Sequence, residues 1–187
     1  MADPPRTRLR ESDESMSKTT KSDKFEPPIG WRVGVALAAA AAVLVLDCLT
    51  KMVVRDTIAV TGESVSVVPG ILSFRYVENI GAAFSMGEGH GLAFALLACV
   101  VTIAIAMYLS RASAVSKVEV LGLGLLAGGA IGNAIDRLTL GYVVDFIATD
   151  FIDFPVFNIA DIGICIGVAL AFLGFMFWSP AAKRGGA

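Results

Sequence analysis

Residues 91–110 read GLAFALLACVVTIAIAMYLS and contain no charged side chain. An α-helix needs about 20 mainly apolar residues to cross the roughly 30 Å of hydrocarbon in a bilayer, and this run has that length. Three further apolar runs occur at 33–46 (extending to 54), 120–135 and 162–179. A chain of 187 residues is too short to bury four such helices in a soluble core, so the sequence predicts four transmembrane helices.

The composition agrees with this distribution. Hydrophobic residues make up 56% of the chain and charged residues 17%, against about 25% in an ordinary soluble domain. These figures exclude a chain that is disordered throughout. The formal net charge of −2 argues against a polyanionic partner, so we expect no nucleic acid to bind.

The two ends of the chain differ from its centre. Residues 1–30 are rich in Pro, Ser and Thr, carry mixed charges and lack apolar periodicity, so we predict a disordered tail. The tail does not read as a secretory signal peptide, because its charged stretch is too long and no small-residue cleavage site follows a short apolar core. We assign 31–180 to a membrane domain and 181–187 to a short C-terminal tail.

Lysine and arginine are distributed unevenly between the two sides of the predicted bundle. Eleven of the 15 lie in the N-terminal segment, in the loop after the second span or at the C-terminus. Cytoplasmic loops carry an excess of these residues, so both termini are predicted to be cytoplasmic.

The two outer loops have different characters. The first, at about 55–90, has β-forming residues on both sides of Pro69-Gly70, which predicts a hairpin or small sheet at the membrane surface. The second, at about 138–158, is short and rich in aromatic and acidic residues, which suits an interfacial position.

Polar side chains within the spans gather at the outer ends of the helices. Asp47 and Lys51 are four residues apart, as are Asn133 and Arg137, so each pair shares a helix face. Ionisable groups in a bilayer are costly and usually face a partner or a cavity, so a polar site is expected near the outer interface. The side chains predicted to lie at this level are Asp47, Thr50, Lys51, Asn79, Asn133, Asp136, Arg137, Asp145, Asn158 and Asp161.

Two stripes of small residues indicate close helix packing. Such stripes let helix backbones approach each other in a membrane. We expect the two stripes to face one another and to bring the outer end of the third helix close to Asp161. They comprise Gly124, Gly128 and Gly132 on the third helix, and Gly163, Gly167 and Ala171 on the fourth.

A pair of carboxylates is the most informative chemical candidate. If Asp145 and Asp161 lie side by side, both cannot ionise easily, and one holds a proton at neutral pH while the other acts as a base. Such a pair can activate a water against an amide carbonyl and protonate the departing nitrogen, without a metal or a covalent intermediate. Spacing alone leaves Asp136, Asp150 and Asp153 as rival members.

The positions of the cysteines and of the histidine offer little support for a metal site or for disulfide bonds. Cys48, Cys99 and Cys165 all fall within predicted spans, where we interpret them as free apolar thiols. His90 is the only histidine, so we expect no metal site and no cofactor.

Three other classes of membrane protein fit parts of the pattern. A transporter or proton-coupled channel would place its ionisable residues near mid-membrane, around broken helices. A non-enzymatic scaffold would account for the glycines but leave two aspartates and two asparagines without a role. A presenilin-like intramembrane aspartic protease would carry a Gly-x-Gly-Asp motif, which is absent from the sequence.

Five motif blocks occur in order between about residues 33 and 178. They are Asp47-Cys-Leu-Thr-Lys51, Glu78-Asn79-Ile-Gly81-Ala82-Ala83-Phe84, Gly128-Gly129-Ala-Ile-Gly132-Asn133-Ala-Ile-Asp136-Arg137, Gly141-Tyr-Val-Val-Asp145-Phe146 and Phe157-Asn158-Ile-Ala160-Asp161. Together they resemble the lipoprotein signal peptidase family, also called signal peptidase II, which comprises bacterial membrane aspartic peptidases.

The resemblance implies a fold and a set of residue roles. The fold is an all-α integral membrane protein with four transmembrane helices, a small extracytoplasmic β-rich cradle and a short interfacial helix near 146–153. Asp145 and Asp161 would form the catalytic dyad, with Asp136 outside it. The implied substrate-binding or supporting positions are Asp47, Lys51, Asn79, Gly81, Asn133, Asp136, Arg137 and Asn158.

The resemblance also implies an activity. Members of the family remove the signal peptide from diacylglyceryl-modified prolipoproteins, cutting before the lipidated cysteine at the outer face of the bacterial cytoplasmic membrane. The expected partners are therefore lipidated prolipoproteins and membrane lipid, and we expect a monomer.

Overall fold

The computed structural model describes residues 27–81 and 89–178. Most of the predicted N-terminal tail and all of the predicted C-terminal tail lie outside the described residues, as does the end of the second motif block, 82–84. The first helix begins at Ile29, two residues before the predicted start of the membrane domain.

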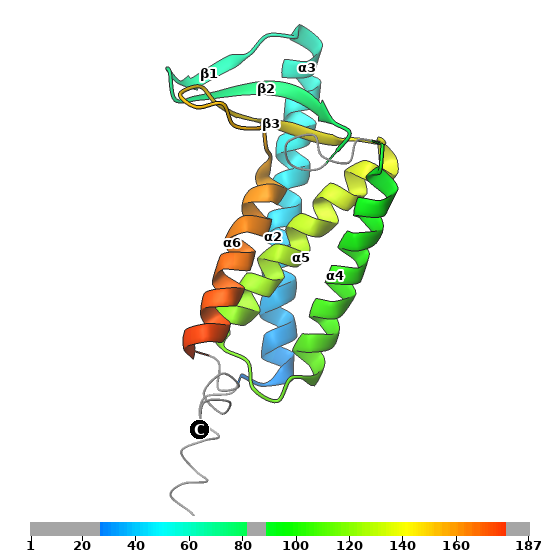
Figure 1. Ribbon diagram of the computed structural model, residues 1–187, viewed down its shortest axis with the longest axis vertical. Helices are drawn as coiled ribbons and strands as arrows, with labels where there is room; N and C mark the ends of the chain where they lie inside the picture. The colour runs from blue at the N-terminus through cyan, green and yellow to red at the C-terminus, as the bar shows by residue number, and fades with distance from the viewer. Residues whose placement is uncertain (1–26, 82–88, 179–187) are drawn as a thin grey trace, which may run out of the picture.

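Long helices lie side by side, with a sheet across one end of the bundle (Figure 1). All four are long and apolar enough to cross a membrane, as predicted. The bundle therefore has the make-up of a multi-pass membrane protein. The helices are α2 (Ile29–Asp56), α4 (Gly91–Arg111), α5 (Lys117–Thr139) and α6 (Ile159–Leu173), and a π-helical segment, Gly174–Trp178, continues α6.

Capping boxes begin two of the long helices, α5 and α6. At the start of α5, the Ser116 hydroxyl accepts from the Glu119 amide, and the Glu119 carboxylate accepts from the Ser116 amide. At the start of α6, Asn158 and Asp161 make the same reciprocal pair. Each box satisfies amides that lack a partner within the helix, and the second one also sets the position of Asp161.

Helix α5 packs against α2 on one face and against α6 on another. A Cβ at Gly124 or Gly128 would collide with the backbone of α2, at Ala36 and Ala40. A Cβ at Gly129 would collide with the carbonyl oxygen of Ala160 on α6. Glycine therefore permits close backbone approach on both faces.

The predicted pairing of the two small-residue stripes is therefore wrong for α5. Its 124–128–132 stripe faces α2, and a second stripe, Gly122 and Gly129, faces α6. At about 3.6 residues per turn, positions seven apart share a face, whereas Gly122 and Gly124 lie on nearly opposite sides. On α6, Gly167 does face α5, but Gly163 packs mainly on the side chain of Val43 in α2.

The predicted hairpin is present. Strands β1 (Val65–Val68), β2 (Leu72–Asn79) and β3 (Val143–Thr149) form an antiparallel sheet in the order β1-β2-β3. The Ile71 amide donates to the Val68 carbonyl at 2.9 Å, and Gly70 has a φ of +73°. Pro69 followed by a residue at positive φ suits the central positions of a type II turn.

The expectation of a short helix near 146–153 is wrong, because residues 143–149 form strand β3. Val143, Val144 and Ile147 favour a strand, and β3 completes the hydrogen bonding of β2, which would otherwise have an open edge. A short helix does occur at the end of the bundle that carries the sheet, but it is α3 (Ile58–Thr61), which ends at Gly62 with a φ of +68°.

The contact between α5 and α6 can be tested by adding one methyl group. We expect Gly129→Ala to lower the free energy of unfolding by about 1–3 kcal/mol, because the new Cβ collides with the α6 backbone. The measurement is thermal unfolding of the protein in detergent. Gly34→Ala is the matched control, since nothing lies within 4 Å of its Cβ position and helical Ala is more stable than Gly by roughly 0.5–1 kcal/mol. An unchanged melting temperature for Gly129→Ala would contradict the close contact.

Candidate active site

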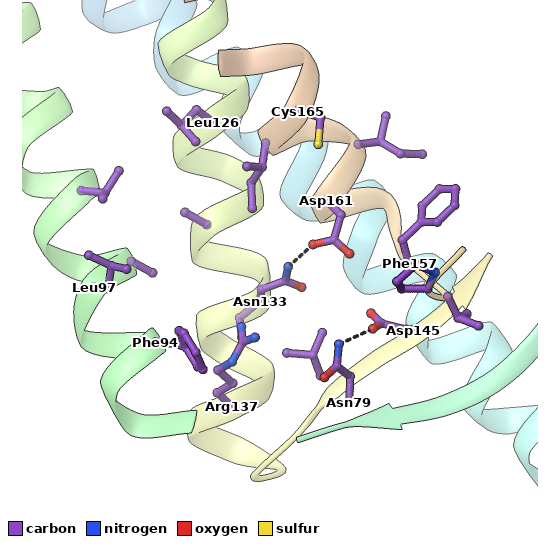
Figure 2. Close-up of a pocket in the computed structure, with 18 of the residues that line it drawn as sticks. Asn79, Phe94, Leu97, Leu126, Asn133, Arg137, Asp145, Phe157, Asp161 and Cys165 are labelled. Atoms are coloured by element: carbon purple, nitrogen blue, oxygen red, sulfur yellow. Dashed lines mark hydrogen bonds between the residues drawn. The ribbon is translucent and has the colours of Figure 1, made fainter. Parts of the chain in front are cut away.

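A cavity of about 680 Å³ lies between α4, α5, α6 and β3, at the end of the bundle that carries the sheet. Its walls are mainly apolar, and its polar side chains gather together (Figure 2). This polar part contains five of the residues singled out from the sequence. They are Asn79, Asn133, Arg137, Asp145 and Asp161.

Asp145 lies on β3 and is held by two amide groups. Asn158 Nδ2 donates to its Oδ1 at 2.6 Å, and Asn79 Nδ2 donates to its Oδ2 at 2.8 Å. Strand pairing explains the second contact, because Asn79 is opposite Val143 and so diagonal to Asp145 on the same face of the sheet. Burial raises the pKa of Asp145 to about 6, the Asn79 hydrogen bond opposes this rise, and the charge of Asp161 adds to it.

Asp161 lies in the first turn of α6 and faces the same space as Asp145 (Figure 2). Its Oδ1 accepts from Asn133 Nδ2 at 2.7 Å, and its Oδ2 accepts from the backbone amide of Asn158 at 3.1 Å. Asn158 is fully buried and bridges the two aspartates. Its side chain donates a hydrogen bond to the Asp145 carboxylate, and its backbone amide donates one to the Asp161 carboxylate.

Two of the three rival aspartates are engaged elsewhere. The Asp136 carboxylate contacts Lys51 Nζ at 2.9 Å and the Val144 amide at 3.2 Å, outside the cavity lining. The Asp150 carboxylate accepts from Ser73 Oγ at 2.8 Å on the sheet. Geometry thus pairs Asp145 with Asp161 and separates both from these two rivals.

Arg137 links three segments beside the pair. Its Nη2 donates to the Gly81 carbonyl at 2.9 Å, and its guanidinium lies 5.3 Å from the centre of the Phe94 ring. The Gly81 amide donates to Asn79 Oδ1 at 2.9 Å. Since this amide occupies Oδ1, the NH₂ group of Asn79 points at Asp145.

A second polar layer lies behind the pair. Lys51 and Asp47 form the predicted same-face pair, with Nζ and Oδ2 2.7 Å apart. Lys51 Nζ also contacts Asn133 Oδ1 at 3.0 Å. The Asp47 Oδ1 atom accepts from the Ala160 amide at 2.9 Å. The two predicted dyad residues and the eight predicted substrate-binding or supporting residues thus lie in or directly behind this region, whereas Thr50 bonds to the backbone of its own helix and lines another pocket.

Sequence reasoning missed several contributors to the cavity. Phe94 occurs within an uninterrupted apolar run, where an aromatic residue carries no signal that separates it from membrane-facing neighbours. The segment 154–157 closes another wall, and only its aromatic character was noted. Cys165, interpreted as an apolar thiol, is free and also lines the cavity.

Four membrane-length helices with two facing carboxylates at one end define a multi-pass membrane protein equipped for aspartic-peptidase chemistry. The family model described as signal peptidase (SPase) II matches residues 39–177, and the chain belongs to this family. It is thus a member of a family of aspartic peptidases.

Curated relatives and solved structures agree with this assignment. The chain is 39% identical over 140 residues to the lipoprotein signal peptidase of Enterococcus faecalis, covering 75% of this chain and 86% of the relative. It is 38% identical over 156 residues to that of Geobacillus thermodenitrificans, covering 82% and 97%. A bacterial membrane enzyme solved by the in meso method at 2.3 Å resolution superposes with a TM-score of 0.71 and 31% identity, covering 83% of this chain and 93% of that one.

The hydrogen bond from Asn79 offers a direct test of the electrostatics at Asp145. We expect Asn79→Ala to raise the pKa of Asp145 from about 6 by about one pH unit, because the ionised carboxylate loses a donor. Asp145 then keeps its proton to a higher pH. The measurement is a carboxyl ¹³C NMR titration, with Asp145→Asn used to assign the signal.

Glu78→Gln is the matched control for this titration. Glu78 lies on the same strand, is exposed, and contacts Tyr76 rather than the pair. The Glu78→Gln substitution should leave the pKa of Asp145 unchanged. An Asn79→Ala titration that coincides with wild type would refute the proposed effect of the Asn79 hydrogen bond.

Proposed function

We propose that this protein removes the signal peptide from diacylglyceryl-modified prolipoproteins, cleaving before the lipidated cysteine. The observation that carries the proposal is the placement of Asp145 and Asp161 around one space, joined through Asn158. Family membership and the activity named in its relatives support the substrate class.

The chemistry follows from a pair that holds one proton. The ionised carboxylate takes a proton from water while the water oxygen attacks the scissile carbonyl carbon, and the protonated carboxyl hydrogen-bonds to the carbonyl oxygen. The tetrahedral intermediate collapses when the amide nitrogen receives a proton and the C–N bond breaks. A carboxylic acid and an amine leave, and the pair again holds one proton.

The surrounding groups suit this chemistry. Burial raises the pKa of Asp145 to about 6, which brings its proton affinity close to the working range of a general acid at neutral pH. Asn158 and Asn133 hold the carboxylates by donated hydrogen bonds. We propose that Arg137, which also donates a hydrogen bond to the Gly81 carbonyl, balances the negative charge of the pair and positions the substrate backbone.

The apolar walls of the cavity suit the apolar part of a membrane-anchored precursor. Leu97 and Val101 of α4 and Leu126 of α5 line it, and Figure 2 shows Leu97 and Leu126 on the side of the space away from Phe157. The outward faces of α4 and α6 carry exposed large apolar side chains, as lipid contact requires. We therefore infer that the substrate enters laterally from the bilayer, with lipid as the surrounding partner.

We infer the orientation from the chain's basic residues. The beginning of α2 and the end of α6 lie at the end of the bundle opposite the sheet (Figure 1). In the sequence, eleven of the 15 lysines and arginines precede or begin α2, flank the connection from α4 to α5, or follow α6, so we place that end in the cytoplasm and the aspartate pair at the outer face of the bacterial cytoplasmic membrane. Because one chain supplies every residue of the site described above, we propose that a monomer is active.

Removing either carboxylate tests the proposal most directly. We expect Asp145→Asn and Asp161→Asn each to lower cleavage at least about 100-fold, because an amide cannot exchange the required proton. The measurement is conversion of a lipidated prolipoprotein by purified enzyme in detergent, and membrane fractionation verifies insertion.

Two controls accompany this assay. Asp150→Asn removes a carboxylate of the sheet surface and should leave cleavage unchanged. Among residues 27–81 and 89–178 there is no group of three His, Cys, Asp or Glu side chains placed to hold a metal, so a chelator should leave wild-type cleavage intact. Substantial activity in either dyad variant would disprove the role of the pair.

A further inference from the structure

A buried lysine lies behind the aspartate pair without lining the cavity. Lys51 is 4% exposed, and its ammonium group contacts three oxygen atoms. These are Asp47 Oδ2 at 2.7 Å, Asp136 Oδ2 at 2.9 Å and Asn133 Oδ1 at 3.0 Å. The contact with Asn133 is a hydrogen bond and the two with the aspartates are ion pairs, and an ammonium group, which has three protons and no acceptor, can serve all three oxygens.

Both carboxylates held by Lys51 reach the backbone immediately before a dyad residue. Asp47 Oδ1 accepts from the amide of Ala160, which precedes Asp161. Asp136 Oδ2 accepts from the amide of Val144, which precedes Asp145. One cation thus connects, through two carboxylates, to the chain positions of both aspartates.

The third contact of Lys51 orients an amide. Because Lys51 only donates, Asn133 must turn its Oδ1 toward it, and the Asn133 NH₂ group then faces Asp161 Oδ1 at 2.7 Å. The opposite orientation would place an NH₂ group against the ammonium and an oxygen against a carboxylate. Asn158 Nδ2 also donates to Asn133 Oδ1, at 3.1 Å, which supports the same orientation.

We propose that Lys51 is a positioning residue for peptide cleavage: through Asp47, Asp136 and Asn133 it sets the place of both dyad aspartates and the direction of the hydrogen bond to Asp161. It acts without touching the substrate. The proposal rests on the function proposed above, in which Asp145 and Asp161 carry out the chemistry.

Removing the ammonium group is the first test. Lys51→Met keeps the unbranched stem of the side chain but should lower kcat by roughly 100-fold, the cost of displacing a catalytic group by about 1 Å, while KM stays within about threefold. The alkaline limb of the pH–rate profile should also move to higher pH, because the positive charge of Lys51 lowers the pKa of Asp145. A smaller folded fraction would lower kcat but would not move this limb.

A double variant separates positioning from charge balance. Wild type has one cation and two carboxylates in the Lys51 cluster, so it carries one net negative charge, and Lys51→Met adds a second. Adding Asp47→Asn restores the net charge and leaves an oxygen that still accepts from Ala160. We expect the alkaline limb to return to its wild-type position while kcat remains low, because Asn133 has lost the ammonium group that its Oδ1 faces and keeps only the weaker neutral donor, Asn158.

Lys117→Met is the matched control. Lys117 lies at the other end of α5, where its ammonium is 5.7 Å from the centre of the Trp31 ring. This variant should cleave like wild type. It shows whether losing any lysine in a helix of the bundle impairs the enzyme in detergent.

Every other outcome counts against the proposal. Wild-type kcat in Lys51→Met, or recovery of kcat in the double variant, would reduce Lys51 to charge balance. Loss of monodisperse protein in both variants would make Lys51 a folding element. If Asp145→Asn or Asp161→Asn remains active, the proposed function itself fails, whereas inactive dyad variants beside active Lys51 variants overturn the positioning role alone.

Discussion

The close approach of α5 to two neighbouring backbones is the constraint on which the site depends. On one face, Gly124 and Gly128 let α5 lie directly against α2, and on another, Gly129 lets it lie against the start of α6. Gly132 extends the first contact to the Asp47 carboxylate. If Cβ atoms stood in these places, Asn133 could not reach both Lys51 and Asp161.

In the site, two asparagines connect groups that a charged side chain could not connect. An amide donates at one end and accepts at the other, so Asn133 connects a cation to a carboxylate, and the Asn158 side chain connects the Asp145 carboxylate to the backbone amide of Asp161. Replacing either asparagine by aspartate would add a negative charge to a low-dielectric region that already holds several carboxylates. Each amide here has fixed partners on both sides, and such saturated networks are rigid.

The sheet also takes part in building the site. Strand β3 places Asp145, and strand β2 places Asn79 diagonally opposite it. The sheet lies across one end of the bundle, so the aspartate pair sits where strand and helices meet. The site therefore combines a carboxylate set by strand register with one set by a helix cap, and these two elements are joined directly by the segment 150–158.

Much of the fold and of the candidate site could be predicted from the sequence, because the sequence patterns that indicate them are local. Apolar runs of helical length predicted the four spans, Pro69-Gly70 between β-formers predicted the hairpin, and four-residue spacing predicted the Asp47–Lys51 pair. The gathering of polar residues at one end of the bundle followed from their positions along each predicted span and from the alternating direction of the spans. The choice of Asp145 and Asp161 over Asp136 came only from the resemblance to a family, because spacing could not rank them.

The sequence by itself determined the four long helices, which end of them is polar and which residues can do chemistry, since composition and periodicity act within a few turns. Only the tertiary structure decided which face of α5 meets which neighbour, that 143–149 is a strand, and that Lys51 connects both aspartates. These features depend on contacts such as that from Asp47 to Ala160, 113 residues apart, whose partners are set by the packing of the whole bundle.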